Sequence, residues 1–392
     1  MIEIRDVPER DVGRMVDLVG TAFHARIDDP ERDSWKPRRA ERIGAYDGDA
    51  LVGQLAALPM RLAVPGAFLD CSAVSFVAVL PTHRRQGILT SLMDRMHADA
   101  IAAGRPVAAL WASQGAIYGR YGFGLATRAI GLEVDTSRPL ALRTVPDERP
   151  LRLVDTASAP ELLDPIHRRA LAARPGGLVR DPEWWARAIL RPVDIEAAEY
   201  TEPRVVVHPA GYAVYRAHWN GTIRVADLVA DTPQVEAALW RYLASIDLTS
   251  RIHAPSRPVD DLIPHMVADP DRVAVKEDHG ALWLRLIDVP AALRARSWAT
   301  EDAFVLEIDD ARIPANSGRW RLTTGPAPSC EPTTESPDLT LSAADLAAAY
   351  LGGVSLTTLT RIGAVTEHTP GGAGRLSASL AVPLAPYIND DF

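Results

Sequence analysis

The stretch at residues 77–90 constrains the fold of this chain most, because it joins a strand pattern to a helix pattern through a basic, glycine-containing turn. An apolar, β-prone run ends at Pro81, and an amphipathic helix pattern begins after Gly87. The first backbone N–H groups of a helix have no intrahelical partner, and the helix dipole adds positive potential there. Gly87 permits a close approach to the backbone, while Arg84 and Arg85 bring positive charge. This order of elements predicts a binding site for a pyrophosphate group.

Length and composition indicate a multidomain globular protein. The 392 residues correspond to about two to four domains, and a hydrophobic content of 47% is enough for full cores. The net charge of −9 argues against a partner that is a nucleic acid and favours cationic substrates.

Targeting and metal signals are missing from the sequence pattern. Cys71 and Cys330 lie far apart and show no metal-ligand spacing, so we expect reduced thiols and no metal. The start of the chain lacks the basic and apolar regions of a signal peptide, and no apolar run reaches the ~20 residues that span a bilayer. We therefore expect a cytoplasmic protein without a membrane span.

The residues at 1–150 read as an α/β unit. A short strand, a helix and an antiparallel meander precede the helix after Gly87, and a buried-type strand follows at 107–111. A segment rich in glycine and tyrosine at 113–124 leads into a final strand near 130–134. This order is typical of an acetyltransferase fold.

The residues at 151–288 repeat much of that order. Helices are expected at 159–172 and 181–190, a hairpin turns at Asn220-Gly221, and Thr232 caps a helix. A strand at 282–287 is expected to complete this unit, which has no basic glycine turn. We interpret it as a second unit of the same kind without a phosphate site, followed at 289–392 by a small α/β unit.

Two sequence strings resemble a known family. Arg84-Arg85-Gln86-Gly87-Ile88-Leu89 is similar to the acetyl-coenzyme A motif of the GNAT acetyltransferases, except that Leu89 replaces a final Gly or Ala. A leucine there is typical of the enhanced-intracellular-survival (Eis) aminoglycoside acetyltransferases, which carry Pro-Thr-His-Arg-Arg-x-Gly-Leu-Leu. The segment 113–124 resembles their string Ser-Glu-Gly-x-Ile-Tyr-Gly-Arg-Phe-Gly-Tyr-Gly, and the ending Asp391-Phe392 resembles their acidic residue and terminal Phe.

The resemblance implies a fold and an assembly. It implies mixed α/β sheets, with tandem GNAT-like domains at 1–150 (catalytic) and 151–288 (without cofactor motif). A sterol-carrier-like domain at 289–392 would follow and supply the C-terminal carboxylate. Members of this family assemble as hexamers, so a homohexamer is expected.

The resemblance also implies the residues that bind acetyl-coenzyme A. The backbone of the strand before the turn would pair with the pantetheine, and the turn and helix start would hold the pyrophosphate. Two residues after the next strand would lie alongside the cofactor. In that order, these are Val77, Ala78 and Val79; Arg85, Gln86, Gly87, Ile88, Leu89 and Thr90; and Ser113 and Gln114.

Acetyl transfer to an amine needs a base for the amine and a proton for the departing thiolate. The resemblance assigns the acid to Tyr118, since an ordinary tyrosine is protonated at neutral pH. Tyr121 is a nearby rival. The resemblance assigns the base to the terminal carboxylate of Phe392, which needs burial or a bridging water because a free carboxylate is weakly basic.

Acceptor residues are expected among acidic and aromatic side chains. Asp28, Asp29 and Trp35 sit in a charged segment that could line a pocket, and Asp391 could add negative charge near Phe392. We expect an N-acetyltransferase that acts on aminoglycoside-like polycations by direct transfer in a ternary complex. Acetylation of protein or peptide lysines, and a non-enzymatic lipid-binding or scaffolding role, stay open as alternatives.

Overall fold

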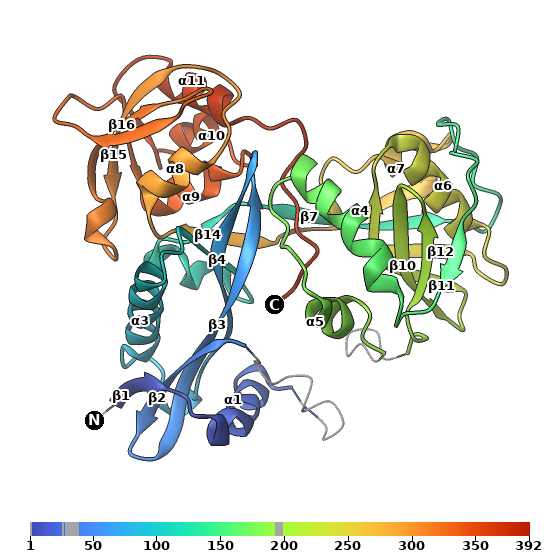
Figure 1. Ribbon diagram of the computed structural model, residues 1–392, viewed down its shortest axis with the longest axis horizontal. Coiled ribbons are helices and arrows are strands. Elements are labelled where there is room, and N and C mark those ends of the chain that lie inside the picture. Colours follow the sequence, from blue (N-terminus) through green and yellow to red (C-terminus); the bar gives the residue numbers. More distant parts are fainter. Residues whose placement is uncertain (1, 26, 28–38, 193–198) are drawn as a thin grey trace. The chain divides into compact units, whose positions relative to one another are not determined.

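The computed structural model describes residues 2–25, 27, 39–192 and 199–392 and divides into two compact units (Figure 1). The first unit comprises Met1–Thr127, Leu282–Val382 and the terminal Phe392. The second comprises Arg128–Ala281 and Pro383–Asp391. Within the described ranges, no helix is both long and apolar enough to cross a bilayer.

The first unit contains a seven-stranded sheet in the order β1-β2-β3-β4-β5-β14-β6. All neighbours are antiparallel except β4 and β5, which are parallel because helix α3 crosses between them. The elements are β1 (Ile2–Asp6), β2 (Glu41–Asp47), β3 (Ala50–Val64), β4 (Ala67–Val79), β5 (Val107–Trp111), β6 (Gly124–Leu125), β14 (Leu282–Leu286), α1 (Val12–Phe23) and α3 (Ile88–Ala102).

Helices α1 and α3 cover opposite faces of this sheet. Alternate residues of β3 face each side: Leu55 packs in the core under α3, and Ala56 packs in the core under α1. Helix α3 buries Leu92, Met93 and Met96 in the first of these cores. The apolar stripe seen in the sequence therefore fixes the position of α3 against the sheet and the direction of its N-terminus.

The second unit contains another seven-stranded sheet, in the order β13-β7-β12-β11-β10-β9-β8. Its one parallel pair is β11 with β12, and α6 crosses between them. The elements are β7 (Arg128–Asp135), β8 (Arg152–Val154), β9 (Arg204–His208), β10 (Gly211–His218), β11 (Thr222–Ala230), β12 (Arg251–Pro258), β13 (Val273–Gly280), α4 (Ala159–Ala173), α5 (Pro182–Trp184), α6 (Pro233–Ala244) and α7 (Ile263–Met266).

Read from β8, the second sheet has the same plan as the first. Strands β8, β9, β10, β11 and β12 correspond to β1, β2, β3, β4 and β5, and each sheet has a helix on the parallel crossover. Tyr212 and Val214 pack on the side of α4, whereas Ala213 and Tyr215 pack on the side of α6. The prediction of tandem acetyltransferase-like sheets is confirmed at this level.

Each of the two predicted units contains one strand that the structure places in the sheet of the other unit. The segment 130–134 was expected to close the first sheet, but β7 pairs with β12 and β13 of the second sheet. The segment 282–287 was expected in the second unit, but β14 pairs with β5 and β6 of the first sheet. Both strands carry buried apolar residues that would suit either sheet, so the local pattern does not specify which sheet each one joins.

The rest of the first unit forms a five-stranded sheet in the order β17-β16-β15-β18-β19, drawn in orange and red in Figure 1. Its elements are β15 (Ala303–Asp309), β16 (Gly318–Thr323), β17 (Ser329–Pro332), β18 (Leu339–Ser342), β19 (Thr366–Glu367), α8 (Val289–Ala295), α9 (Ala343–Tyr350), α10 (Leu356–Arg361) and α11 (Gly372–Leu380). Helix α9 packs against β6 and β14, so this part adjoins the first sheet.

Several expected local signals are confirmed. Thr232 caps α6 by accepting from the Val235 N–H at 3.3 Å, and the hairpin between β10 and β11 turns at Gly221 with φ +84°. The helix expected at 181–190 is shorter: α5 has three residues and continues as a π-helical turn over Trp185–Ile189.

A buried acidic residue makes the second unit sensitive to pH. Glu236 on α6 accepts from Arg257 Nη2 at 3.2 Å and from Trp240 Nε1 at 3.3 Å. Burial, followed by the neighbouring charge of Asp261, raises the pKa of Glu236 to about 7. Between its ordinary pKa and this value, the folded chain holds a proton that the unfolded chain has lost, so stability falls as pH rises through that interval.

We therefore predict that Glu236→Gln stabilises the protein more at pH 7.5 than at pH 5, by a difference of about 1–3 kcal/mol. The amide keeps an oxygen for Arg257 and Trp240 but has no charge to desolvate. Urea unfolding of the wild type and the variant at the two pH values gives the free energies of unfolding. The transition is monitored by a spectroscopic signal that reports on the second unit. If the free energies of unfolding of the two proteins differ by the same amount at both pH values, the raised pKa assigned to Glu236 is contradicted.

Candidate functional site

The sheet of the first unit opens where β4 leaves β5. The parallel ladder runs from Cys71 opposite Val107 to Val74 opposite Leu110, and in the described residues it goes no further. Strand β4 nevertheless continues to Val79, still paired on its other side with β3. The end of β4, which carries Val77, Ala78 and Val79, therefore has a ladder on one side only.

A β-bulge marks this point. The register between β3 and β4 shifts between Gln54 and Ala56, so that two residues of β4, Phe76 and Val77, stand opposite one residue of β3. Phe76 has φ +56°, a left-handed conformation that is uncommon for a bulky residue. Bulges bend a strand and redirect its side chains, and this one turns the end of β4 away from its parallel neighbour.

The predicted basic turn follows directly. A 3-10 turn at Pro81–His83 leads to Arg84, whose Nε donates to the Val79 carbonyl at 3.3 Å. Arg85 and Gly87 both have positive φ, at 64° and 82°, and this path brings the chain sharply into α3. The residues from Arg84 to Gly87 are exposed, so the turn is open to solvent.

The N-terminus of α3 is left uncapped by side chains. Gly87 is the N-cap and supplies no side-chain acceptor, and the first helical bond runs from Ser91 N to Gly87 O at 3.1 Å. The N–H groups of Ile88, Leu89 and Thr90 precede that bond and therefore lie in the unpaired first turn. The arrangement fits a pyrophosphate held by main-chain amides beside two guanidinium groups.

The glycine-rich segment after β5 forms two successive 3-10 turns, Gly115–Ile117 and Gly119–Tyr121. Ser113 and Gln114 precede them and are exposed. Tyr118 lies between the two turns, and its carbonyl accepts from Tyr121 N at 3.0 Å and from Phe123 N at 3.3 Å. We call residues 113–124 the tyrosine loop.

Tyr118 is buried, with 6% of its surface exposed, and shares one core cluster with Ile88, Val77 and Val79. Burial, followed by the neighbouring Tyr121, raises the pKa of Tyr118 to about 12. Among the described residues, its hydroxyl has no hydrogen-bond partner. The structure thus places a neutral phenol that can give a proton in the same cluster as the end of β4 and the start of α3.

Tyr121 is held differently. Its hydroxyl lies 3.2 Å from Thr90 Oγ1, on the first turn of α3, and the Arg312 guanidinium lies 5.5 Å from its ring centre. The sequence offers Tyr121 as an alternative to Tyr118 for the general acid. The hydroxyl of Tyr121 already has a hydrogen-bond partner, Thr90 Oγ1. Tyr121 instead ties the tyrosine loop to the helix that begins at the basic turn.

The C-terminal tail is anchored in the second unit rather than frayed. Asp390 is 1% exposed and accepts from Arg180 Nε at 2.7 Å and from Trp184 Nε1 at 2.8 Å. Arg180 is equally buried and also pairs with Asp227 at 2.6 Å. Asp391 is exposed, and the side chain of the terminal Phe392 is half-buried.

Three predicted acceptor residues, Asp28, Asp29 and Trp35, lie outside the described residues. The sequence reasoning missed Arg180, whose part in holding the tail depends on partners 47 and 210 positions away. No local motif marks such a residue, because an arginine between Val179 and Asp181 is compatible with many environments.

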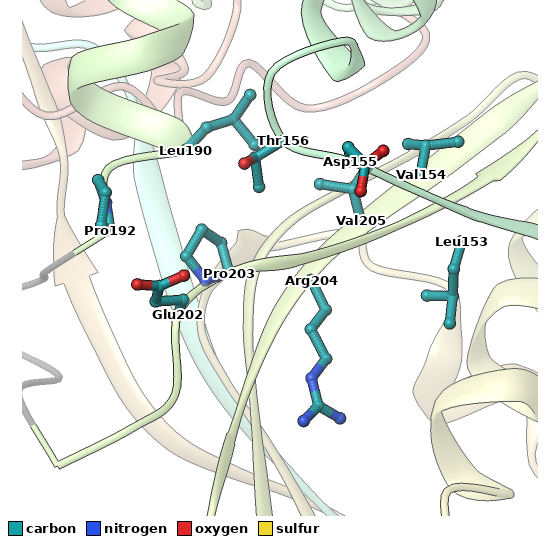
Figure 2. Close-up of a pocket in the computed structure, with 10 residues that line it drawn as sticks. All are labelled: Leu153, Val154, Asp155, Thr156, Leu190, Pro192, Glu202, Pro203, Arg204 and Val205. Atoms are coloured by element: carbon teal, nitrogen blue, oxygen red, sulfur yellow. The ribbon is translucent and has the colours of Figure 1, made fainter.

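The second unit holds a pocket of about 270 Å³ that contains none of the predicted site residues (Figure 2). It is lined from β8, β9 and the segment after α5, with Asp155, Glu202 and Arg204 among its walls. Because two acids and an arginine line this pocket, its charge is mixed. We therefore assign the pocket no role in the chemistry.

The cysteines offer no nucleophile. Cys71 on β4 and Cys330 on β17 are both free and buried, and burial raises the pKa of each thiol to about 12. Across the described part of the chain, no group of three or more His, Cys, Asp or Glu side chains is placed to hold a metal ion.

Known protein families match all three parts of the chain. Residues 3–126 and 176–286 each match an acetyltransferase (GNAT) domain family, and residues 289–389 match a sterol carrier protein domain family. An uncharacterized N-acetyltransferase of Streptomyces avermitilis is 38% identical over 378 residues, which covers 92% of each chain. The N-acetyltransferase Eis of Mycobacterium bovis is 35% identical and covers 81% of this chain and 80% of its own.

A solved structure agrees with these relatives. Eis1 from Mycobacterium abscessus superposes with a TM-score of 0.87 at 33% identity and covers both chains completely. Identity and coverage at these levels, together with the open end of β4 and the uncapped start of α3, settle the family. The chain belongs to the Eis-like N-acetyltransferases of the GNAT superfamily and is an acetyltransferase with tandem GNAT domains and a sterol-carrier-like domain.

Proposed function

We propose that the enzyme acetylates amines of polycationic, aminoglycoside-like small molecules by direct transfer from acetyl-coenzyme A in a ternary complex. The observation that carries this proposal is the grouping of a buried, neutral Tyr118 with the open end of β4 and the uncapped start of α3. The net charge of −9 supports a cationic acceptor, because an acidic protein raises the local concentration of cations.

Acetyl-coenzyme A would supply the acetyl group, and the chain's own residues would hold it. We assign the pantetheine to the backbone of Val77, Ala78 and Val79, where β4 has lost its parallel neighbour. We assign the pyrophosphate to the turn and helix start: Arg85, Gln86, Gly87, Ile88, Leu89 and Thr90. Ser113 and Gln114, exposed at the start of the tyrosine loop, would lie alongside the cofactor.

Tyr118 would act as the general acid. A phenol whose pKa is raised to about 12 stays protonated throughout the working range, so it is available to donate a hydrogen bond, and then its proton, to the sulfur as the thiolate leaves the thioester. Direct transfer is supported by the two thiols, since buried cysteines with a pKa of about 12 are poor carriers of an acyl group.

The terminal carboxylate of Phe392 would act as the base. A frayed tail could not position it, and the tail is held two residues earlier by Asp390 on Arg180 and Trp184. Asp391 would add negative charge for a cationic acceptor, as would Asp28 and Asp29 with the aromatic Trp35. We further propose the domain roles implied by the resemblance for 1–150, 151–288 and 289–392, with β7 and β14 exchanged between the first two. We also propose a cytoplasmic homohexamer.

We predict that Tyr118→Phe lowers kcat about 100-fold, because general acid catalysis contributes roughly 10²–10⁴. The affinity for acetyl-coenzyme A should stay within about twofold, since the variant keeps the ring and the helix start. Thiol release measures turnover, and calorimetry measures affinity.

Tyr121→Phe is the matched control for this experiment. It removes a hydroxyl from the same loop, and we expect a loss in kcat of less than about fivefold. Full turnover in Tyr118→Phe, or a larger loss in Tyr121→Phe, would move the acid away from Tyr118.

We predict that a short Gly-Ser extension after Phe392 lowers kcat at least about tenfold, because it removes the carboxylate from its position. Phe392→Leu retains the terminal carboxylate and should keep most of the activity. The same extension placed at the N-terminus controls for the presence of a tag. A fully active enzyme with the C-terminal extension would exclude the terminal carboxylate from catalysis.

The acceptor class is tested with a panel of aminoglycosides, simple diamines and lysine peptides. We predict the highest kcat/KM for aminoglycosides, with a KM that rises with salt because screening weakens the attraction of a polycation. A higher kcat/KM for lysine peptides would indicate that the acceptor is a protein and not a small molecule. No turnover of any amine, together with no binding of acetyl-coenzyme A, would contradict the proposal as a whole.

A further inference from the structure

A buried ion pair joins the sterol-carrier-like part of the first unit to the tyrosine loop. Arg285 on β14 donates through Nη2 to both carboxylate oxygens of Asp310, at 2.8 and 2.6 Å. The side chains are 0% and 2% exposed. Asp310 follows β15 and lies within the residues that match the sterol carrier protein domain.

Asp310 is itself held rigidly. Its Oδ1 accepts from the backbone N–H groups of Arg312 and Ile313, at 3.1 and 3.0 Å, and its Oδ2 accepts from Asn316 Nδ2 at 2.9 Å. A carboxylate with this many donors keeps its charge and its direction, and its pKa is lowered by the Arg285 charge and the donors despite burial. The position of Asp310 therefore fixes the position of the guanidinium.

Arg285 lies directly against the tyrosine loop. Gly122, which ends the second 3-10 turn of the loop, has φ +81°, and a Cβ there would lie 2.5 Å from Arg285 Nη1. Among the described residues, Nε and Nη1 of Arg285 have no hydrogen-bond partner, so the guanidinium depends on Asp310 alone for its ionic partner. Moving Asp310 would leave a buried cation unpaired beneath the loop.

Among the described residues, the charged and titratable groups that interact with Arg285 include Asp310 and His97. His97 on α3 is buried, and burial and the Arg285 charge lower its pKa to about 3, so it is neutral. Its ring stacks on Phe123 at 6.2 Å between centres. Phe123 in turn meets the Tyr118 ring edge-on at 6.2 Å. The pair, the loop and Tyr118 are thus connected by packed side chains.

A second contact comes from the same segment. Arg312 donates through Nε to the Arg120 carbonyl at 3.5 Å, and its Nη1 pairs with Asp94 of α3 at 3.5 Å. Its guanidinium also lies over the Tyr121 ring. Arg312 therefore contacts the tyrosine loop at Arg120 and Tyr121, and Arg285, held by Asp310, contacts it at Gly122. All three loop residues lie on the C-terminal side of Tyr118.

We propose that Asp310, through Arg285, is a positioning residue for Tyr118, so that the sterol-carrier-like domain serves catalysis by fixing the tyrosine loop. This inference rests on the proposed role of Tyr118. The acid must lie within hydrogen-bond reach of the departing sulfur, and a displacement of about 1 Å costs on the order of 100-fold in rate. The basic turn and the first turn of α3 lie outside the ion pair and outside Gly122, the part of the loop that Arg285 contacts. We therefore expect the pair to affect turnover more than cofactor binding.

The test is Asp310→Asn in the full chain, measured at 25 °C. We expect kcat to fall at least about tenfold while the Kd for acetyl-coenzyme A, measured by calorimetry, changes less than about threefold. In the Tyr118→Phe background, the same substitution should change kcat less than about twofold, because a positioning residue has nothing left to position. A full additional loss in the double variant would overturn the proposal.

Asp261→Asn is the matched control. Asp261 is an equally buried carboxylate that accepts from Arg257 Nε at 2.6 Å in the second unit, far in sequence from the loop. It should lose stability with kcat unchanged. If it lowers kcat as much as Asp310→Asn does, the effect is one of general destabilisation and the proposal fails.

Arg312→Gln tests the same idea without a buried charge, should Asp310→Asn not fold. Its side chain is 30% exposed, so the variant should fold, and we expect kcat to fall about three- to tenfold with an unchanged Kd. Wild-type kcat in this variant would count against the proposal. If Tyr118→Phe alone leaves turnover intact, the proposed acid is wrong, and this outcome is distinct from a failure of Asp310→Asn alone.

Discussion

The separation of β4 from β5 after Val74 is the constraint on which the site depends. Up to that residue the two strands share a parallel ladder, and beyond it the bulge at Phe76 carries β4 away. A strand end that keeps a ladder on one side only can pair with the amides of an extended ligand on the other. The same strand then delivers the chain to the basic turn and to the N-terminus of α3.

The second sheet shows why topology alone does not make this site. It has the same strand order and the same crossover helix, yet α6 begins at Thr232, whose hydroxyl accepts from Val235 N, and at Pro233, which has no N–H group. The first turn of α6 therefore offers fewer free donors to an anion. Helix α3 begins at Gly87 and has no side-chain cap, so its donors remain available to an anion.

Buried arginines hold segments that are distant in the sequence. Arg180 fixes the tail through Asp390, and Arg285 fixes the tyrosine loop through Asp310. A buried ion pair gives little net stability, but removal of one partner leaves an uncompensated charge, so the geometry of such a pair is strongly specified. Tyr118 precedes the part of the tyrosine loop that Arg285 contacts, and Phe392 follows Asp390, which Arg180 holds. Both residues proposed for proton transfer therefore lie next to a segment that a buried arginine fixes.

The sequence alone determined the features that depend on neighbouring residues. The strand, basic turn and helix at 77–90, the cap at Thr232, the hairpin at Gly221 and the family itself could all be predicted, because each rests on local hydrogen bonding or on a contiguous string. Nine of the predicted cofactor residues fall on the end of β4, the basic turn and the start of α3 for the same reason, and Ser113 and Gln114 follow β5. Their roles, like that of Tyr118, stay predictions.

Only the tertiary structure decided which sheet each apolar strand joins and which charges meet. Strands β7 and β14 are exchanged because sheet membership depends on partners across the whole chain, and neither strand's own pattern names them. Arg285 and Asp310 lie 25 positions apart, and Arg180 and Asp390 lie 210 apart. A desolvated charge selects its partner by proximity in the folded chain, and that proximity is absent from any local stretch of sequence.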